Sequence, residues 1–142
     1  MKFLPIDILY EIPAQSVSST EYVTVNGTIT GPDLPMALAG HVMVAINSTC
    51  SLVIGGRPEA ASGNSTWTFF YDHIEGEWIN GPSLMHGRIL HAAGIVTDEV
   101  TDEHFIAVTG GFNYDFGYYL NSTEILQDGN FVQGKITPPL FN

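Results

Sequence analysis

The sequence predicts an all-β protein built from repeated units, and three observations support this prediction. Apolar residues make up 44% of the 142 residues, which is enough for one folded core. Fifteen glycines and eight prolines divide the chain into short segments, as turns between strands require and long helices do not. The segment SLVIGG (51–56) recurs as IAVTGG (106–111), which places Gly55 and Gly110 one repeat of 55 residues apart. We therefore expect short antiparallel strands in repeated order and no helix.

Each predicted strand is a short run rich in β-branched and aromatic residues that ends at a turn signal such as Asp128-Gly129. The strands predicted in this way are 21–25, 28–30, 41–46, 51–54, 66–71, 77–79, 91–96, 105–109, 124–127 and 131–133. The segment 19–35 resembles 122–140, so the chain begins inside a repeat. This divides the sequence into an amino-terminal extension (1–18), the outer strands of a partial unit (19–35), a first full unit (36–82) and a second (83–142).

Charge and cysteine content exclude several classes of protein. Four Lys and Arg residues against fifteen Asp and Glu residues give a formal net charge of −11, which repels a phosphate backbone, so we expect no nucleic-acid partner. Cys50 is the single cysteine, so the chain forms no internal disulfide and no multi-cysteine metal site. Pro5 and Asp7 interrupt the amino-terminal apolar run, and no run has the length of a membrane span; we expect neither a secretory signal nor membrane insertion.

The first full unit carries a pattern of spaced motif residues. They are Gly55-Gly56 at a strand end, Tyr71-Asp72, Trp78 seven residues after the tyrosine, and Arg88 with His91 before the next unit. The pattern resembles the kelch repeat, the blade unit of one class of β-propeller. The resemblance covers roughly residues 19–140 and implies a partial kelch-type β-propeller with antiparallel four-stranded blades. The second unit is degenerate, because it keeps Gly110-Gly111 but has Leu126 and Phe131 at the aromatic positions, at a shorter spacing.

We interpret these motif residues as structural. Paired glycines allow positive φ and close backbone approach, and Tyr71 and Trp78 supply apolar area for a core. Arg88 and His91 can donate hydrogen bonds to loop carbonyls and so connect one blade to the next. A closed propeller takes 4 to 8 blades, and this chain holds about two and a half. We therefore expect either part of a longer protein or self-association through the open blade edges.

Four asparagines lie in Asn-x-Ser/Thr sequons and are candidate glycosylation sites: Asn26, Asn47, Asn64 and Asn121. Chance would place about one such sequon in a chain of this composition. The alternative is that Asn, Ser and Thr are simply common in β-turns. The localisation prediction is therefore conditional: extracellular or secretory if a signal-bearing parent uses the sequons, and otherwise cytoplasmic.

No motif predicts catalysis, a cofactor or a metal. The chain lacks nucleophile-elbow, zinc-protease, phosphate-loop and dinucleotide signatures, and its five histidines have no metal-ligand spacing. Four carboxylates within 98–103 are typical of a solvated hairpin tip. The alternative hypothesis is part of a propeller enzyme, resembling a copper-radical oxidase or a glycosidase, whose active-site residues lie outside this chain.

The main functional hypothesis is a non-catalytic protein–protein interaction module of kelch type, with a protein partner of unknown identity. The loops at 57–63 and 112–120 differ between the two units, as recognition loops do. The second loop is aromatic and predicts a partner-binding surface at Phe112, Tyr114, Phe116, Tyr118 and Tyr119. The alternative is that these rings pack on one another over the sheet.

Overall fold

All regular structure in the computed structural model is β, and no helix occurs in the described residues, 15–59 and 65–134. The predicted all-β class is therefore confirmed. Every strand pair is antiparallel, the sheets have two or four strands, and none of them closes on itself.

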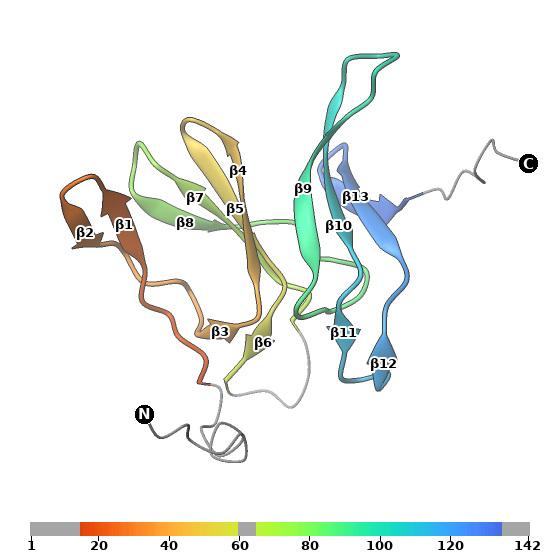
Figure 1. Ribbon diagram of the computed structural model, residues 1–142, viewed down its shortest axis with the longest axis horizontal. Helices are drawn as coiled ribbons and strands as arrows, with labels where there is room; N and C mark the ends of the chain where they lie inside the picture. The colour runs from red at the N-terminus through yellow and green to blue at the C-terminus, as the bar shows by residue number, and fades with distance from the viewer. Residues whose placement is uncertain (1–14, 60–64, 135–142) are drawn as a thin grey trace, which may run out of the picture.

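Two four-stranded sheets form the body of the molecule (Figure 1). The first contains β4 (Val42–Asn47), β5 (Cys50–Ile54), β7 (Thr68–Asp72) and β8 (Glu77–Asn80), in that order. The second contains β9 (Ala92–Thr97), β10 (His104–Thr109), β13 (Thr123–Gln127) and β14 (Asn130–Gln133), again in chain order. Because β4 and β9 lie beside each other, the first strand of each sheet forms the side on which the two sheets meet.

Three two-stranded ribbons complete the described structure. They are β1 (Glu21–Thr24) with β2 (Gly27–Thr30), β3 (Leu38–Ala39) with β6 (Arg57–Pro58), and β11 (Phe112–Asn113) with β12 (Tyr118–Tyr119). β6, β11 and β12 lie in the segments 57–63 and 112–120, which were expected to be loops, and the last two ribbons lie at the same end of the molecule (Figure 1). Each strand of these two ribbons has only two residues, which is too short for a strand pattern to be visible in the sequence.

Backbone hydrogen bonds identify equivalent positions in the repeats. A glycine N–H bonds to a threonine carbonyl after each outer strand pair: Gly31 to Thr20 at 2.9 Å, Gly81 to Thr68 at 2.8 Å, and Gly134 to Thr123 at 2.7 Å. The ribbon β1–β2 is thus equivalent to β7–β8 and to β13–β14. Across these outer pairs Tyr71 faces Trp78, and Leu126 faces Phe131.

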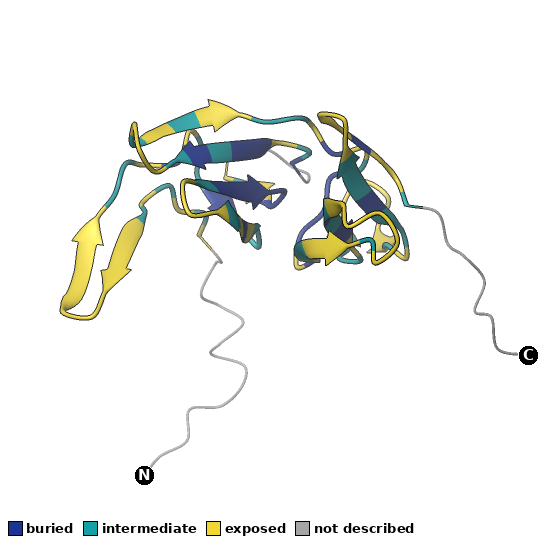
Figure 2. Ribbon diagram, turned by 90° about the horizontal axis from the view of Figure 1, so that it is seen from above, coloured by how far each residue is buried: buried dark blue, intermediate teal, exposed yellow. Residues whose placement is uncertain are grey.

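The core has two parts. The larger part lies between the two four-stranded sheets and contains Val44, Leu52, Ile54, Leu84, Ile106, Val108 and Phe131. The smaller part packs the segment after β2 onto the first sheet and contains Leu34, Leu38, Val53 and Phe69. Figure 2 shows the buried residues concentrated in the two sheets, while the ribbon β1–β2 projects away from them and is exposed along its whole length.

Candidate functional site

The aromatic hairpin, defined as residues 112–119, contains all five side chains of the predicted partner-binding surface. β11 and β12 pair Phe112 with Tyr119, and a turn carries the chain between them. Phe112 is half-buried, whereas the other four rings are exposed: Tyr114 by 50%, Phe116 by 51%, Tyr118 by 55% and Tyr119 by 80%. The structure therefore brings these five residues together on one hairpin and leaves most of their ring area open to solvent.

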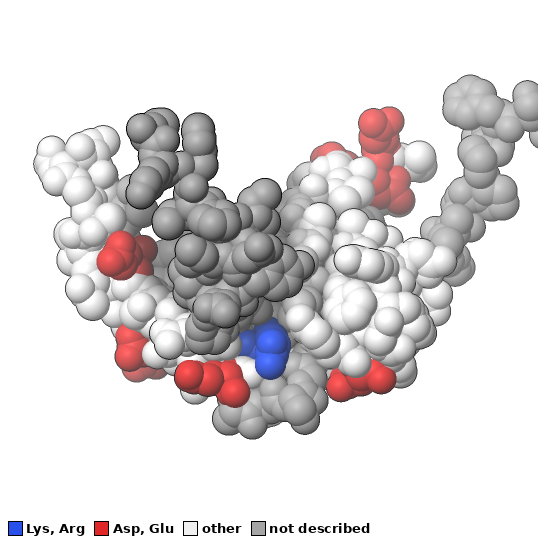
Figure 3. Space-filling view, turned by 60° about the horizontal axis from the view of Figure 1, so that its bottom comes forward, with Lys and Arg blue, Asp and Glu red and all other residues white. Residues whose placement is uncertain are grey.

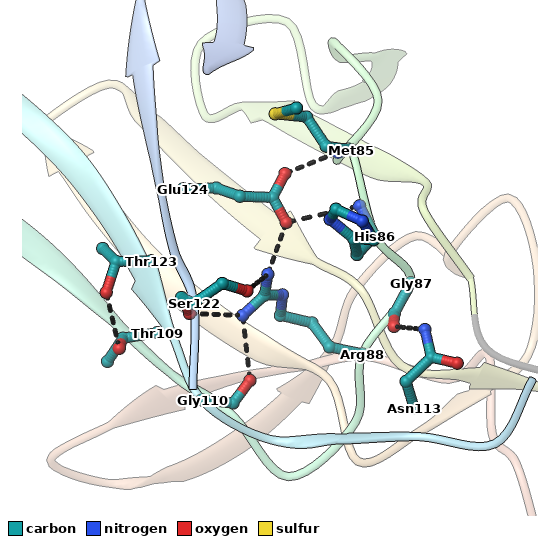
Figure 4. Close-up of polar contacts among 10 residues, drawn as sticks. All are labelled: Met85, His86, Gly87, Arg88, Thr109, Gly110, Asn113, Ser122, Thr123 and Glu124. Carbon is teal, nitrogen blue, oxygen red and sulfur yellow. Dashed lines mark hydrogen bonds and ion pairs between the residues drawn. The ribbon is translucent and has the colours of Figure 1, made fainter. Parts of the chain in front are cut away.

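The aromatic hairpin is fixed to the body of the protein by backbone and amide hydrogen bonds. Ile89 and Phe112 exchange two backbone hydrogen bonds, of 3.1 and 2.9 Å. The buried Asn113 donates from Nδ2 to the Gly87 carbonyl at 2.6 Å (Figure 4) and accepts at Oδ1 from the Phe116 N–H at 2.9 Å. Sequence reasoning missed Asn113, although a single amide inside an aromatic run is a signal for such a turn.

The exposed rings form two contacting groups. Phe112 makes edge contacts with Tyr114 and Tyr119, with centroids 5.0 and 5.1 Å apart, and Phe116 stacks on Tyr118 at 5.5 Å. These distances lie in the range in which aromatic pairs attract each other. The self-packing expected as the alternative therefore occurs, and it holds the rings in place without covering their outer faces.

One arginine lies against this surface. The Arg57 guanidinium, at the start of β6, lies 5.3 Å from the centroid of the Tyr114 ring, within cation–π range. Among the described residues the basic side chains are Arg57 and Arg88, and Arg88 is fully buried. Figure 3 shows arginine between acidic groups at this end, beside a broad uncharged area. Sequence reasoning missed Arg57, which only the fold places beside the hairpin.

A buried ion pair lies beneath the hairpin. The Arg88 Nη2 to Glu124 Oε2 distance is 2.5 Å, and the two side chains are 0% and 1% exposed. Arg88 also donates from Nη1 to the carbonyls of Gly110 at 2.9 Å and Ser122 at 3.2 Å (Figure 4). Its own carbonyl accepts from the Gly56 N–H of the first sheet at 2.9 Å. Arg88 therefore connects the two sheets through its backbone and braces the second sheet through its side chain.

Glu124 also accepts hydrogen bonds from the segment that links the sheets. Its carboxylate accepts from the backbone N–H groups of Met85, at 2.5 Å, and His86, at 3.4 Å (Figure 4). Sequence reasoning missed this residue, because an acid between Thr123 and Ile125 in a strand is indistinguishable from an exposed one. The carboxylate has a structural role, holding the linking segment and Arg88 together.

His91 differs from the sequence expectation. It is buried, neither ring nitrogen makes a well-formed hydrogen bond, and a backbone contact with Ile54 only partly opposes the effect of burial. Burial, together with the nearby positive charge of Arg88, lowers the pKa of His91 from 6.5 to about 4. The imidazole therefore packs as a neutral ring against the first sheet.

The paired glycines enclose the segment that links the sheets. Gly55 has φ of 63°, and a Cβ there would lie 2.7 Å from the Arg88 carbonyl oxygen. Gly111 has φ of 88°, and a Cβ there would lie 2.6 Å from the Ile89 carbonyl oxygen. These positions require glycine both for the left-handed backbone and for the close approach. Gly56 and Gly110 also have positive φ.

Three of the four sequon asparagines lie in the described residues, and all three are exposed. Asn26 lies in the β1–β2 turn, Asn47 ends β4, and Asn121 precedes β13. The Asn47 side-chain oxygen accepts from the Thr49 backbone N–H at 2.8 Å and hydroxyl at 2.9 Å. Asn64 lies outside the described residues.

The acidic segment 98–103 forms the turn between β9 and β10. Asp98 accepts from the Val100 N–H at 2.8 Å and from the Thr101 N–H at 3.3 Å, and these bonds lower its pKa. Within residues 15–59 and 65–134, no group of three or more His, Cys, Asp or Glu side chains is placed to hold a metal ion. The same residues contain no helix long and apolar enough to cross a membrane.

The chain matches no protein-family model, and comparison with curated proteins gave no significant match.

Proposed function

We propose that this chain is a non-catalytic protein-interaction module and that the aromatic hairpin is its contact surface. The observation that carries the proposal is the set of four rings, each at least half exposed, on a hairpin anchored to the body through buried Asn113. Tyrosine, phenylalanine and arginine are enriched at protein interfaces, and Arg57 adds the arginine. Rings already held by mutual contacts lose little conformational entropy when a partner covers them.

Features of the fold support assignment of the two sheets as neighbouring propeller blades. The strands of each sheet follow chain order, and the first strands lie beside each other. A single apolar core joins the two sheets, and the paired glycines receive the linking segment. In such an arrangement the loops between second and third strands project at one end, as the loop with β6, which pairs with β3, and the aromatic hairpin do. The kelch resemblance adds the expectation that this end carries binding.

The proposal is tested by comparing which proteins bind to the natural chain and which bind to two variants of it. The double substitution Tyr118→Ser and Tyr119→Ser removes exposed aromatic area from the hairpin without touching its buried anchor. The control Ile74→Ser removes an equally exposed apolar side chain, 73% accessible, from the β7–β8 turn. We expect a specific protein to be captured by the natural chain and the control and to be lost with the double variant, because an aromatic anchor contributes about 2 kcal/mol or more. Equal capture by both variants would remove the hairpin from the proposal.

A further inference from the structure

A second site lies at the opposite side of the first sheet, away from the aromatic hairpin. A pocket of about 250 Å³ separates the ribbon β1–β2 from the face of that sheet. The lining residues that matter for its chemistry are Glu21, Tyr22, Met43, Tyr71, His73 and Trp78.

One wall of the pocket comes from β1 and the other from the first sheet. β1–β2 precedes the first sheet as the equivalent pair β7–β8 precedes the second, and within the described residues no further strand pairs with β1. Met43 of β4 is 53% exposed. At the junction of the two four-stranded sheets the same region is filled, because Leu126 and Phe131 pack into the main core.

The residues around the pocket are more aromatic than those at the junction of the two four-stranded sheets. Tyr71 and Trp78 occupy the positions of Leu126 and Phe131, and their ring centroids lie 4.7 Å apart with the planes tilted by 42°. Tyr22 adds a third ring, whose centroid lies 6.2 Å from that of Tyr71. Three π systems from three strands thus converge on one small pocket.

The polar atoms of these rings already have partners. The Trp78 indole N–H donates to the Pro32 carbonyl at 3.0 Å, and the hydroxyls of Tyr22 and Tyr71 contact each other. The His73 Nε2 atom lies 2.9 Å from the Ser51 hydroxyl. Because Tyr71 is only 3% exposed, the pocket offers a ligand mainly the rings of Tyr22 and Trp78 and the Met43 thioether, and few free hydrogen-bonding groups.

Charge selects among the ligands that such a surface could take. Glu21 is exposed and lines the pocket, no basic residue of the described part of the chain does so, and the whole chain carries a formal charge of −11. This combination repels anions and favours cations. A cation with an apolar shell suits ring faces that offer no hydrogen bonds, and methylated ammonium groups are the usual partners of such aromatic surroundings.

We propose that this pocket binds a small methylated ammonium cation, held against the rings of Tyr22 and Trp78 beside the buried Tyr71 and attracted by Glu21. The site is independent of the aromatic hairpin and of the proposed protein-binding function.

The test is a titration of the full 142-residue chain at pH 8 with choline, followed by NMR of the tryptophan indole N–H groups. The matched probe is 3,3-dimethylbutan-1-ol, which has the shape of choline with carbon in place of the charged nitrogen. We expect choline to shift the Trp78 indole resonance and not that of Trp67, and to bind about tenfold more tightly than the neutral alcohol. Equal binding of both probes, or no shift of Trp78, would overturn the proposal.

Two variants and two matched controls locate the site. Tyr22→Leu removes one ring from an exposed ribbon and is expected to weaken choline binding about tenfold, and Glu21→Gln about threefold. Tyr118→Leu on the aromatic hairpin and Glu99→Gln in the β9–β10 turn change the same residue types elsewhere and should leave binding unchanged. Unchanged resonances of Trp67 in each variant show that the sheet is intact. Undiminished binding by Tyr22→Leu would contradict the proposed site.

Discussion

One equivalent position is filled by two apolar side chains at the first four-stranded sheet and by an ion pair at the second. In the first sheet Leu38 and Phe69 meet there, each 1% exposed, as part of an apolar cluster. In the second sheet Arg88 and Glu124 meet there as a hydrogen-bonded ion pair with the same degree of burial. Leu38 and Arg88 each lie three residues before the histidine of their linking segment. Phe69 and Glu124 each follow the threonine whose carbonyl accepts the glycine N–H bond.

In both sheets this position is filled by side chains that exclude water, but the kind of side chain differs. Burial of the apolar pair away from water stabilises the folded protein by about 2 kcal/mol for each large side chain. The ionic pair must first offset the loss of hydration of two charges, which requires a nearly complete set of hydrogen bonds. The guanidinium and carboxylate therefore bind the linking segment and the glycine loop, whereas the apolar pair makes no such bonds.

Removal of one partner of the ion pair is expected to have the largest effect. Glu124→Ala leaves the Arg88 guanidinium buried without its counter-charge and leaves the Met85 N–H without its acceptor. We expect the free energy of unfolding to fall by about 3–5 kcal/mol, measured by urea denaturation. The control Glu99→Ala, in the exposed β9–β10 turn, should change it by about 0.5 kcal/mol or less. Equal effects of the two substitutions would mean that the pair is not buried in solution.

The glycine pairs extend the comparison to the backbone. Gly55 and Gly110 are equivalent and have φ of 63° and 67°, but a Cβ at Gly110 would find only the Leu120 carbonyl oxygen, 3.9 Å away. Gly55→Ala must bear both the unfavourable φ and the clash with the Arg88 carbonyl, so we expect a loss of about 3 kcal/mol. Gly110→Ala has only the unfavourable φ, so we expect the free energy of unfolding to fall by about 1 kcal/mol. Thermal unfolding of both variants measures the difference, and equal losses would show that the close approach is relieved at little cost.

His91 provides a test by pH. Its pKa is about 4 in the folded protein and near 6.5 when unfolded, so the unfolded chain binds the proton first as the pH falls. The stability is complete above about pH 6.5 and is lost as the pH falls toward 4, by about 3 kcal/mol at most for this residue. His91→Gln should flatten the stability curve, measured by urea denaturation, between pH 6.5 and 4. Burial also lowers the pKa of His41, so part of the slope should remain in His91→Gln.

Much of the sheet structure was accessible from the sequence. The repeat spacing and the short runs of β-branched and aromatic residues predicted both sets of four strands in their order. The placement of Leu126 and Phe131 at the aromatic positions agrees with the register, in which they face each other as Tyr71 and Trp78 do. Local patterns suffice here because these strands pair with their neighbours in the chain.

The remaining features depend on contacts that sequence patterns do not contain. The strands β3, β6, β11 and β12 have two residues each, too short for periodicity. Glu124 is buried because Arg88 reaches it from a segment 36 residues away, and nothing in the strand itself marks the carboxylate as internal. Asn113 and Arg57 likewise gain their roles from the segments that the fold places beside them. The predicted aromatic surface was found because a cluster of rings is visible in composition alone.

The smallest effect is expected when an apolar pair like that of the first sheet replaces the ion pair of the second. In the double variant Arg88→Leu, Glu124→Phe, the second sheet receives the apolar pair found at the equivalent position of the first sheet. The gain from apolar burial is offset because the Met85 N–H and the Gly110 and Ser122 carbonyls lose their partners. We expect a change of about 1 kcal/mol or less in the free energy of unfolding, although Glu124→Ala alone is strongly destabilising. If the double variant is instead as unstable as the single one, the hydrogen bonds of the ion pair, and not its burial, hold the linking segment, and the two positions are equivalent only in shape.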